Sequence, residues 1–108
     1  MTVSYTHLND TTLGWYSTLR DECKKKVRAY AYNQEEDKLP LDLIRIAMGS
    51  IADYAVFPLQ DVLCLGSKGR MNTPGVASGN WSWRYLKGAL QPSLAEELKR
   101  ITILYGRY

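Results

Sequence analysis

The sequence is poor in cysteine, with Cys23 and Cys64 the only two among 108 residues and neither in a Cys-x-x-Cys spacing. A disulfide framework needs more cysteines, and a zinc site needs more ligands than two thiols and a single histidine provide. We therefore expect two free, buried thiols in a reducing compartment, with no metal and no cofactor.

Long apolar runs are also missing. No stretch approaches the ~18 apolar residues of a membrane span, and the first ten residues have neither the positive start nor the apolar run of a secretory signal. We expect no membrane partner and a cytoplasmic location, or a plastid if a transit peptide has been removed. The net charge of +3 is too small to indicate a nucleic-acid partner, and the basic run Lys24–Arg28 is expected to be a solvated helix face.

What the sequence does contain is typical of one globular domain spanning residues 1–108. Hydrophobic residues make up 45% of the chain and charges of both signs are interspersed, which excludes a disordered composition. Eight tyrosines and three tryptophans stand against one phenylalanine. Aromatic rings with a polar edge suit half-buried surfaces and clefts.

The first half of the chain predicts a strand and then a helix. Residues 2–6 alternate like a strand, and Asp10 or Thr11 can cap a helix over residues 11–32. The apolar stripe of that helix repeats at helical spacing: Tyr16, Leu19, Cys23, Val27 and Tyr30.

A second helix, a second strand and a last helix follow. Pro40 suits the first turn of the second helix, whose stripe comprises Leu41, Ile44, Met48 and Ile51. The apolar run 54–58 is typical of a strand buried on both faces, and a short helical turn is expected over residues 59–65. After an irregular segment 66–83, a capping box of Ser93 and Glu96 predicts the last helix, which Gly106 is placed to end.

The expected fold class is therefore α/β and rich in helix, with two β/α units. If the two strands are parallel neighbours, both outer edges of their sheet lack a partner. Open edges on so small a sheet favour pairing with another chain, so we expect a homo-oligomer or a complementing chain.

Three stretches carry a resemblance to one family: T-H-L-N-D-T-T-L-G-W-Y at residues 6–16, P-L-Q-D-V-L-C-L-G at 58–66, and R-M-N-T-P-G with G-N-W-S-W-R between residues 70 and 84. In this order they resemble signatures of the amylomaltases, the 4-α-glucanotransferases of the α-amylase clan. The helix L-I-R-I-A-M-G-S-I-A and the closing L-Y-G-R are also similar to the end of that family, so the resemblance covers essentially the whole chain.

The resemblance implies the last two β/α units of a (β/α)₈ barrel that transfers α-1,4-glucan segments between maltooligosaccharides. Such barrels carry their active site at the carboxyl ends of the strands, and retaining chemistry uses a carboxylate nucleophile and a carboxylic acid. Both of these lie upstream of the matching region in the family. The implied partner is an α-1,4-glucan, and this chain alone is not expected to be active.

Leu8 occupies the place of the family's third carboxylate, because the family pattern reads T-H-D-N-D where this chain reads T-H-L-N-D. Leucine can neither accept a hydrogen bond from a sugar hydroxyl nor oppose a developing positive charge. Loss of one such partner typically costs on the order of 10² in rate. Tyr5 and Cys64 also depart from the family, which usually has glycine at both places. We therefore assign no catalytic residue to this chain.

Three residues are the candidates for contact with glucan: His7, Asn72 and Trp81. In the family the histidine contacts the sugar at the cleavage site, although a neutral histidine satisfied by backbone is an equal reading. Asn72 can instead hold a tight turn, and the alternation of Trp81 with Trp83 favours one ring inside and one outside. Gln60 and Asp61 are expected to brace the turn after the second strand. The alternative function is a stand-alone module that binds glucan weakly or self-associates.

Overall fold

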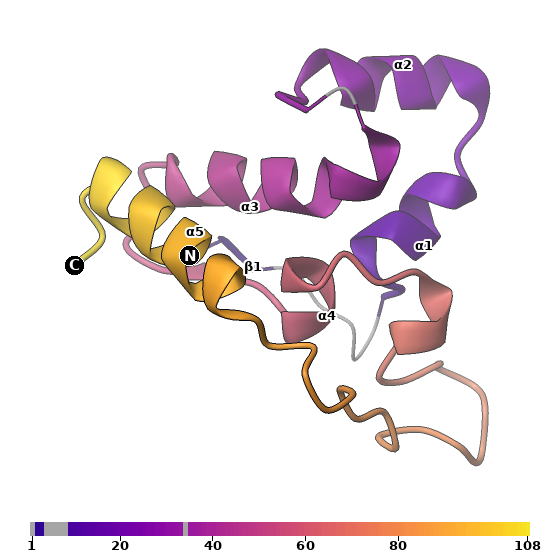
Figure 1. Ribbon diagram of the computed structural model, residues 1–108. Helices are drawn as coiled ribbons and strands as arrows, with labels where there is room; N and C mark the ends of the chain where they lie inside the picture. The colour runs from indigo at the N-terminus through magenta and orange to yellow at the C-terminus, as the bar shows by residue number, and fades with distance from the viewer. Residues whose placement is uncertain (1, 4–8, 34) are drawn as a thin grey trace.

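The computed structural model describes residues 2–3, 9–33 and 35–108 (Figure 1). Tyr5, His7 and Leu8 therefore lie outside the described residues. The elements run in the order β1 (Thr2–Val3), α1 (Thr12–Ser17), α2 (Asp21–Ala29), the 3₁₀ turn η1 (Glu36–Lys38), α3 (Leu39–Met48), β2 (Ala55–Val56), α4 (Leu59–Val62), the 3₁₀ turn η2 (Ser67–Gly69) and α5 (Pro92–Leu104). The prediction of a helix-rich α/β chain is confirmed.

The two strands form a parallel pair, with Thr2 opposite Ala55 and Val3 opposite Val56. Ala55 and Phe57 pack against the core, as alternate residues of a strand do. Tyr54 and Val56 point the other way and are 68% and 48% exposed. The expectation that the run 54–58 is buried on both faces is therefore wrong, because helices cover one face of this strand and no described segment covers the other.

The predicted helix over residues 11–32 is two helices with a break between Ser17 and Asp21. The hydroxyls of Ser17 and Thr18 donate to the carbonyls of Gly14 and Trp15, each at 2.7 Å. Such local bonds compete with the helical ladder and favour its end. Thr11 is the N-cap, as expected, and accepts the Gly14 amide at 3.1 Å.

Because of the break, the predicted apolar stripe is not buried along its whole length. Tyr16 on α1 is buried, whereas Tyr30 after α2 is 72% exposed and α2 has no buried residue. Figure 1 shows α2 standing apart from α3 and α5.

Cys23 and Cys64 are free but only half-buried, so the prediction of buried thiols is wrong in degree.

The core gathers α3, β2, α4 and α5 around one small apolar cluster. Its buried members are Ile44, Met48, Val62 and Ile101, and the partly buried residues around them are Leu41, Ala55, Phe57, Leu59, Leu94, Leu98 and Tyr105. Pro40 lies in the first turn of α3, as predicted. Ile51 does not extend the stripe: the helix ends at Met48 and Ile51 is fully exposed.

Arg107 fastens the end of α3 to the segment that leads into β2. Its guanidinium donates to the carbonyls of Met48, Ser50 (3.0 Å) and Ala52 (2.8 Å). A planar group with five fixed donors suits such a cluster of acceptors. The closing residues of the chain thus set where β2 begins.

The last helix starts differently from the prediction. It begins at Pro92 with Gln91 as its N-cap, and no side chain caps it. Ser93 and Glu96 therefore lie inside the helix and form no capping box. Its end is as predicted: Gly106, at φ +65°, donates to the carbonyl of Ile103, and Arg107 donates to that of Thr102.

The surface is large for the chain's mass. The accessible area is 7588 Å², whereas a compact monomer of 12.3 kDa exposes about 6,100 Å². The radius of gyration is 14.4 Å against about 13 Å expected. Among the described residues, no helix is both long and apolar enough to cross a membrane.

Cys64 ends α4 in the same way that Gly106 ends α5. At the end of α4, Cys64 donates to the carbonyl of Asp61 and Leu65 to that of Gln60, with φ +54° at Cys64. This is the Schellman ending, which favours glycine. Burial raises the pKa of the Cys64 thiol, so the side chain is uncharged at neutral pH.

We predict that Cys64→Gly stabilises the chain by about 0.5–1 kcal/mol, because a residue with a Cβ pays for the left-handed conformation. This corresponds to a rise of a few degrees in Tm. Cys64→Ala is the matched control, since it removes the thiol and keeps the Cβ. Urea unfolding followed by circular dichroism measures both. Equal stabilisation by Gly and Ala would contradict the conformational explanation.

Candidate functional site

The segments that follow β1 and β2 lie together at one end of the strand pair, held by a buried carboxylate. Asp61, 2% exposed, accepts the backbone amide of Thr12 at 2.9 Å and its hydroxyl at 2.8 Å. The two residues are 49 positions apart. Asp61 thus satisfies an amide at the first turn of α1, where free N–H groups and the helix dipole favour a negative charge.

A second tie joins the same two segments. Ser67 donates its hydroxyl to Asp10 at 2.6 Å, and Asp10 also accepts the amide of Thr11 at 2.8 Å. Gly14 faces this contact, and a Cβ there would overlap the Asp10 carboxylate and the Ser67 hydroxyl. The absence of a side chain at Gly14 therefore allows the tie to form.

The role predicted for Gln60 and Asp61 is incomplete. Both are buried, and Asp61 also reaches across to brace α1, which the prediction did not include. The Gln60 Nε2 atom is buried and has no acceptor within the described part of the chain. Neither side chain reaches the surface to meet a ligand.

The irregular segment predicted between residues 66 and 83 contains a closed loop. The Trp81 amide donates to the carbonyl of Met71 at 2.7 Å and closes its base. Asn80 accepts the Thr73 amide at 2.9 Å and donates to the Val76 carbonyl at 2.7 Å, which braces the middle. Sequence reasoning missed Asn80; the signal was an asparagine beside glycine, a residue type that closes turns with its side chain.

Asn72 and Trp81 lie near the base of this loop. Arg70 donates to the backbone carbonyl of Asn72 at 2.7 Å, and the Asn72 residue is half-buried. Trp81 is 58% exposed at φ +60°, whereas Trp83 is half-buried. One ring is thus more buried than the other, as the alternation predicted. His7, the third candidate, lies outside the described residues.

Trp83 lines an apolar groove of about 800 Å³. Its other lining residues come from the end of α4, from η2 and from the segment before α5: Leu63, Leu65, Gly66, Ser67, Lys68, Gly69, Arg84, Tyr85, Leu86 and Ala89. A groove with aromatic walls and a cationic rim can hold an apolar face with polar edges. It adjoins the segment that contains Ser67.

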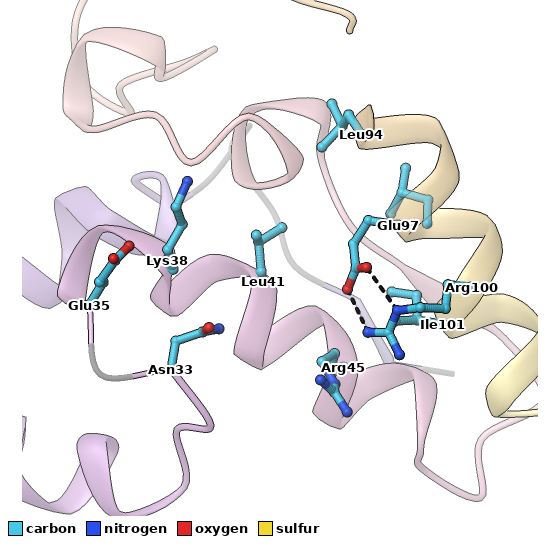
Figure 2. Close-up of a pocket in the computed structure, with 10 residues that line it drawn as sticks. Asn33, Glu35, Lys38, Leu41, Arg45, Leu94, Glu97, Arg100 and Ile101 are labelled. Carbon is cyan, nitrogen blue, oxygen red and sulfur yellow. Dashed lines mark hydrogen bonds and ion pairs between the residues drawn. The ribbon is translucent and has the colours of Figure 1, made fainter. Parts of the chain in front are cut away.

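A second cavity, of about 530 Å³, lies between α3, η1 and α5 (Figure 2). Glu97 points toward Arg100 and accepts two hydrogen bonds from it, at 2.7 and 2.8 Å. The hydrogen bonds from Arg100 lower the pKa of Glu97. This carboxylate is therefore paired and ionised, which makes it unsuited to act as a general acid near neutral pH.

No group of three or more potential metal ligands occurs in the described ranges 2–3, 9–33 and 35–108. The only carboxylates near the strand ends in these ranges are Asp10 and Asp61, and both are engaged in hydrogen bonds to backbone and hydroxyl groups. The hydrogen bonds of these two carboxylates join the segment after β1 to the segment after β2.

Comparison with known proteins gives one consistent family. The profile of the family described as 4-alpha-glucanotransferase matches residues 1–90. The 4-alpha-glucanotransferase of Synechocystis is 47% identical over 102 residues, covering 94% of this chain and 20% of the relative. The 4-alpha-glucanotransferase of Thermus thermophilus is 46% identical over 99 residues, which cover 87% of this chain and 20% of the relative. The chloroplastic/amyloplastic 4-alpha-glucanotransferase of Solanum tuberosum is 45% identical over 105 residues, which cover 94% of this chain and 18% of the relative.

A solved structure shares the fold. The amylomaltase from Streptococcus agalactiae, in complex with acarbose, superposes with a TM-score of 0.84 at 28% identity, over 96% of this chain and 21% of that one. The chain thus spans about a fifth of the length of the relatives it matches, and it corresponds to a C-terminal portion of them.

We predict that Asp61→Ala destabilises the chain by about 2–3 kcal/mol, because two donors on Thr12 lose a buried charged acceptor. Asp53→Ala is the control, since the Asp53 side chain is exposed and a surface change is expected within about 0.5 kcal/mol. Chemical unfolding measures both variants. Equal losses for the two would show that the tie to α1 contributes nothing.

Proposed function

Because the chain belongs to the 4-α-glucanotransferase family, we propose that it forms one arc of the glucan cleft of such an enzyme. In this proposal β1, β2 and their helices are the last two β/α units of a (β/α)₈ barrel. The cleft lies at the carboxyl ends of the strands, where the segments after β1 and β2 are tied together by Asp61 and Ser67.

The observation that carries the proposal is the match to an amylomaltase over 96% of the chain at a TM-score of 0.84. The parallel strand pair supports it, because strands in such barrels are all parallel. The acarbose named with that amylomaltase is a saccharide analogue, and a saccharide is the class of ligand that we propose for this chain.

We assign glucan contact to His7, Asn72 and Trp81. His7 precedes Asn9 by two positions in the sequence, and Asn72 and Trp81 lie at the base of the closed loop. The exposed indole of Trp81 offers a flat apolar face to the face of a sugar ring. Leu8 supplies no carboxylate at the family's third acidic position.

The chain by itself is proposed to lack catalysis. Retaining transfer needs a nucleophile and an acid about 5 Å apart, and the family's resemblance places both upstream of the matched segment. The described carboxylates near the strand ends are used as structural acceptors. Two β/α units cannot position the full set of reacting groups.

A stand-alone glucan-binding module is the second candidate. The specific observation in its favour is that Trp81 is 58% exposed on a loop whose base its own backbone amide closes, so the ring is presented at the surface. Such a module binds maltooligosaccharide weakly and does not transfer it.

We expect maltoheptaose to bind the chain with a Kd in the millimolar range, measured by isothermal titration. Trp81→Ala should weaken binding about fivefold, since a ring contact contributes about 1 kcal/mol. Tyr30→Ala, just after α2, is the control with a similarly exposed aromatic ring. Incubation with maltotriose should yield no glucose and no longer glucans. Rapid disproportionation by this chain alone would overturn the proposal, as would binding unaffected by Trp81→Ala.

A further inference from the structure

Arg45 on α3 is a cation whose neighbouring carboxylates are both engaged with other groups. Asp42, three residues earlier on the same helix, accepts the Asn33 side-chain amide at 2.7 Å and the Asn33 backbone amide at 3.2 Å. An acid placed three residues before a base on a helix commonly pairs with it, but here the acid is taken. Glu97 on α5 accepts two hydrogen bonds from Arg100. In the described part of the chain, Arg45 therefore has no carboxylate partner of its own.

The guanidinium of Arg45 is also short of hydrogen-bond acceptors. Its Nε atom is buried and, among the described residues, meets no acceptor. The group lies over the Tyr32 ring, with its Cζ atom 4.8 Å from the ring centroid, and this stacking restricts the plane in which its N–H groups point. A buried donor without a protein partner indicates a bound water or ion. Water can satisfy the N–H group but leaves the positive charge uncompensated.

Arg45 lines the cavity of about 530 Å³ between α3, η1 and α5, a volume within the range of small-molecule sites. Figure 2 shows Arg45 and the Glu97–Arg100 pair on the same side of this cavity. The apolar part of the lining consists of side chains that also pack on or in the core: Leu41, Leu94, Leu98 and Ile101. The cavity thus combines an apolar wall with a cation that has no counter-ion among the described residues.

The charges around the cavity favour a negatively charged ligand. The lining contains two carboxylates and three cations, so one positive charge is in excess: Glu35, Glu97, Lys38, Arg45 and Arg100. The hydrogen bonds from Arg100 lower the pKa of Glu97, and the charge of Arg45 lowers it further. Glu97 is therefore ionised at neutral pH, and its two oxygens are directed at Arg100 rather than at Arg45.

We propose that this cavity binds a small organic anion, with a carboxylate or phosphate group paired to Arg45 and an apolar body, the size of about one ring, against Leu94 and Leu98. A planar guanidinium can donate two parallel hydrogen bonds to either head group. The inference goes beyond the proposed function, because none of the residues that line this cavity is a candidate for glucan contact.

The test is isothermal titration of the chain with four probes: benzoate, phenyl phosphate, inorganic phosphate and benzyl alcohol. We expect the better of the two organic anions to bind with a Kd of about 1 mM, and that anion identifies the head group that the site prefers. Inorganic phosphate lacks the apolar body and benzyl alcohol lacks the charge, so each should bind about tenfold more weakly. Either of them binding as tightly as the organic anions would overturn the inference, as would no binding of either organic anion at about 10 mM.

Substitution of Arg45 locates the contact. Arg45→Gln should weaken binding of the better organic anion about tenfold, because it removes the charge-assisted pair. Arg20→Gln is the matched control: Arg20 is exposed just before α2 and does not line the cavity, so the same charge is lost elsewhere. Equal effects of the two would reduce the binding to general charge attraction and contradict the site. If Arg45→Gln does not fold by circular dichroism, Arg45→Lys takes its place and should weaken binding about threefold, since an ammonium group has no planar pair of donors.

Substitution of Glu97 should act in the opposite direction. Glu97→Gln removes a negative charge from the cavity and releases the Arg100 guanidinium, so the organic anion should bind about threefold more tightly. Glu96→Gln is the control, because Glu96 is the exposed preceding residue on α5 and does not line the cavity. If the Glu97–Arg100 pair only supports the helix, Glu97→Gln leaves binding unchanged or weakens it, and either result would overturn the inference.

Discussion

The buried carboxylate of Asp61 is the constraint on which the arrangement of the strand ends depends. It brings the first turn of α1 to the start of α4 across 49 positions of sequence. A buried carboxylate is costly to leave unpaired, and Thr12 supplies two donors to it. The Asp10–Ser67 bond lies beside this contact and needs Gly14 to have no side chain. Because both ties join the segment after β1 to the segment after β2, the two β/α units behave as one frame at the carboxyl end of the strand pair.

At the opposite end of the strand pair, where β2 begins, an arginine rather than a carboxylate makes the ties. Arg107 donates to carbonyls at the end of α3 and in the segment before β2, so the entry of β2 into the sheet is set from the last residues of the chain. Between these two ends the apolar core is small and lies on one face of the sheet. Polar ties therefore do much of the positioning that a larger core does in a complete domain, where most of the apolar surface is buried. The hydrogen bonds at the two ends of the strand pair therefore explain how so small an apolar cluster supports a defined arrangement of the strand ends.

Local chemistry made part of the fold predictable. Thr11 at an N-cap, Pro40 in a first turn and Gly106 at a helix end each act within their own helix, so their sequence positions indicated their roles. The break after Ser17 was missed because helical spacing of apolar residues continued across it. The contact of Asp61 with Thr12 has no local signature, since it depends on a parallel pairing of distant strands. The candidate glucan contacts were suggested only with the family resemblance, which led to Asn72 and Trp81 as candidates but gave no indication that Asn80 braces their loop.

The departures from the family pattern differ in their physical consequence. Cys64 stands at φ +54° at the end of α4, which gives a conformational reason for the glycine that the family usually has there. Its cost is strain in the backbone, and the hydrogen bonds of that helix end are nevertheless made. At Leu8, two positions before Asp10 in the sequence, the change removes a carboxylate and is therefore a change of chemistry. The ties of Asp61 to Thr12 and of Ser67 to Asp10 are both formed in this chain. Under the proposed function, the chain therefore retains the support for a glucan cleft while lacking a charge that the family's chemistry uses, which is why binding and transfer are separate properties here.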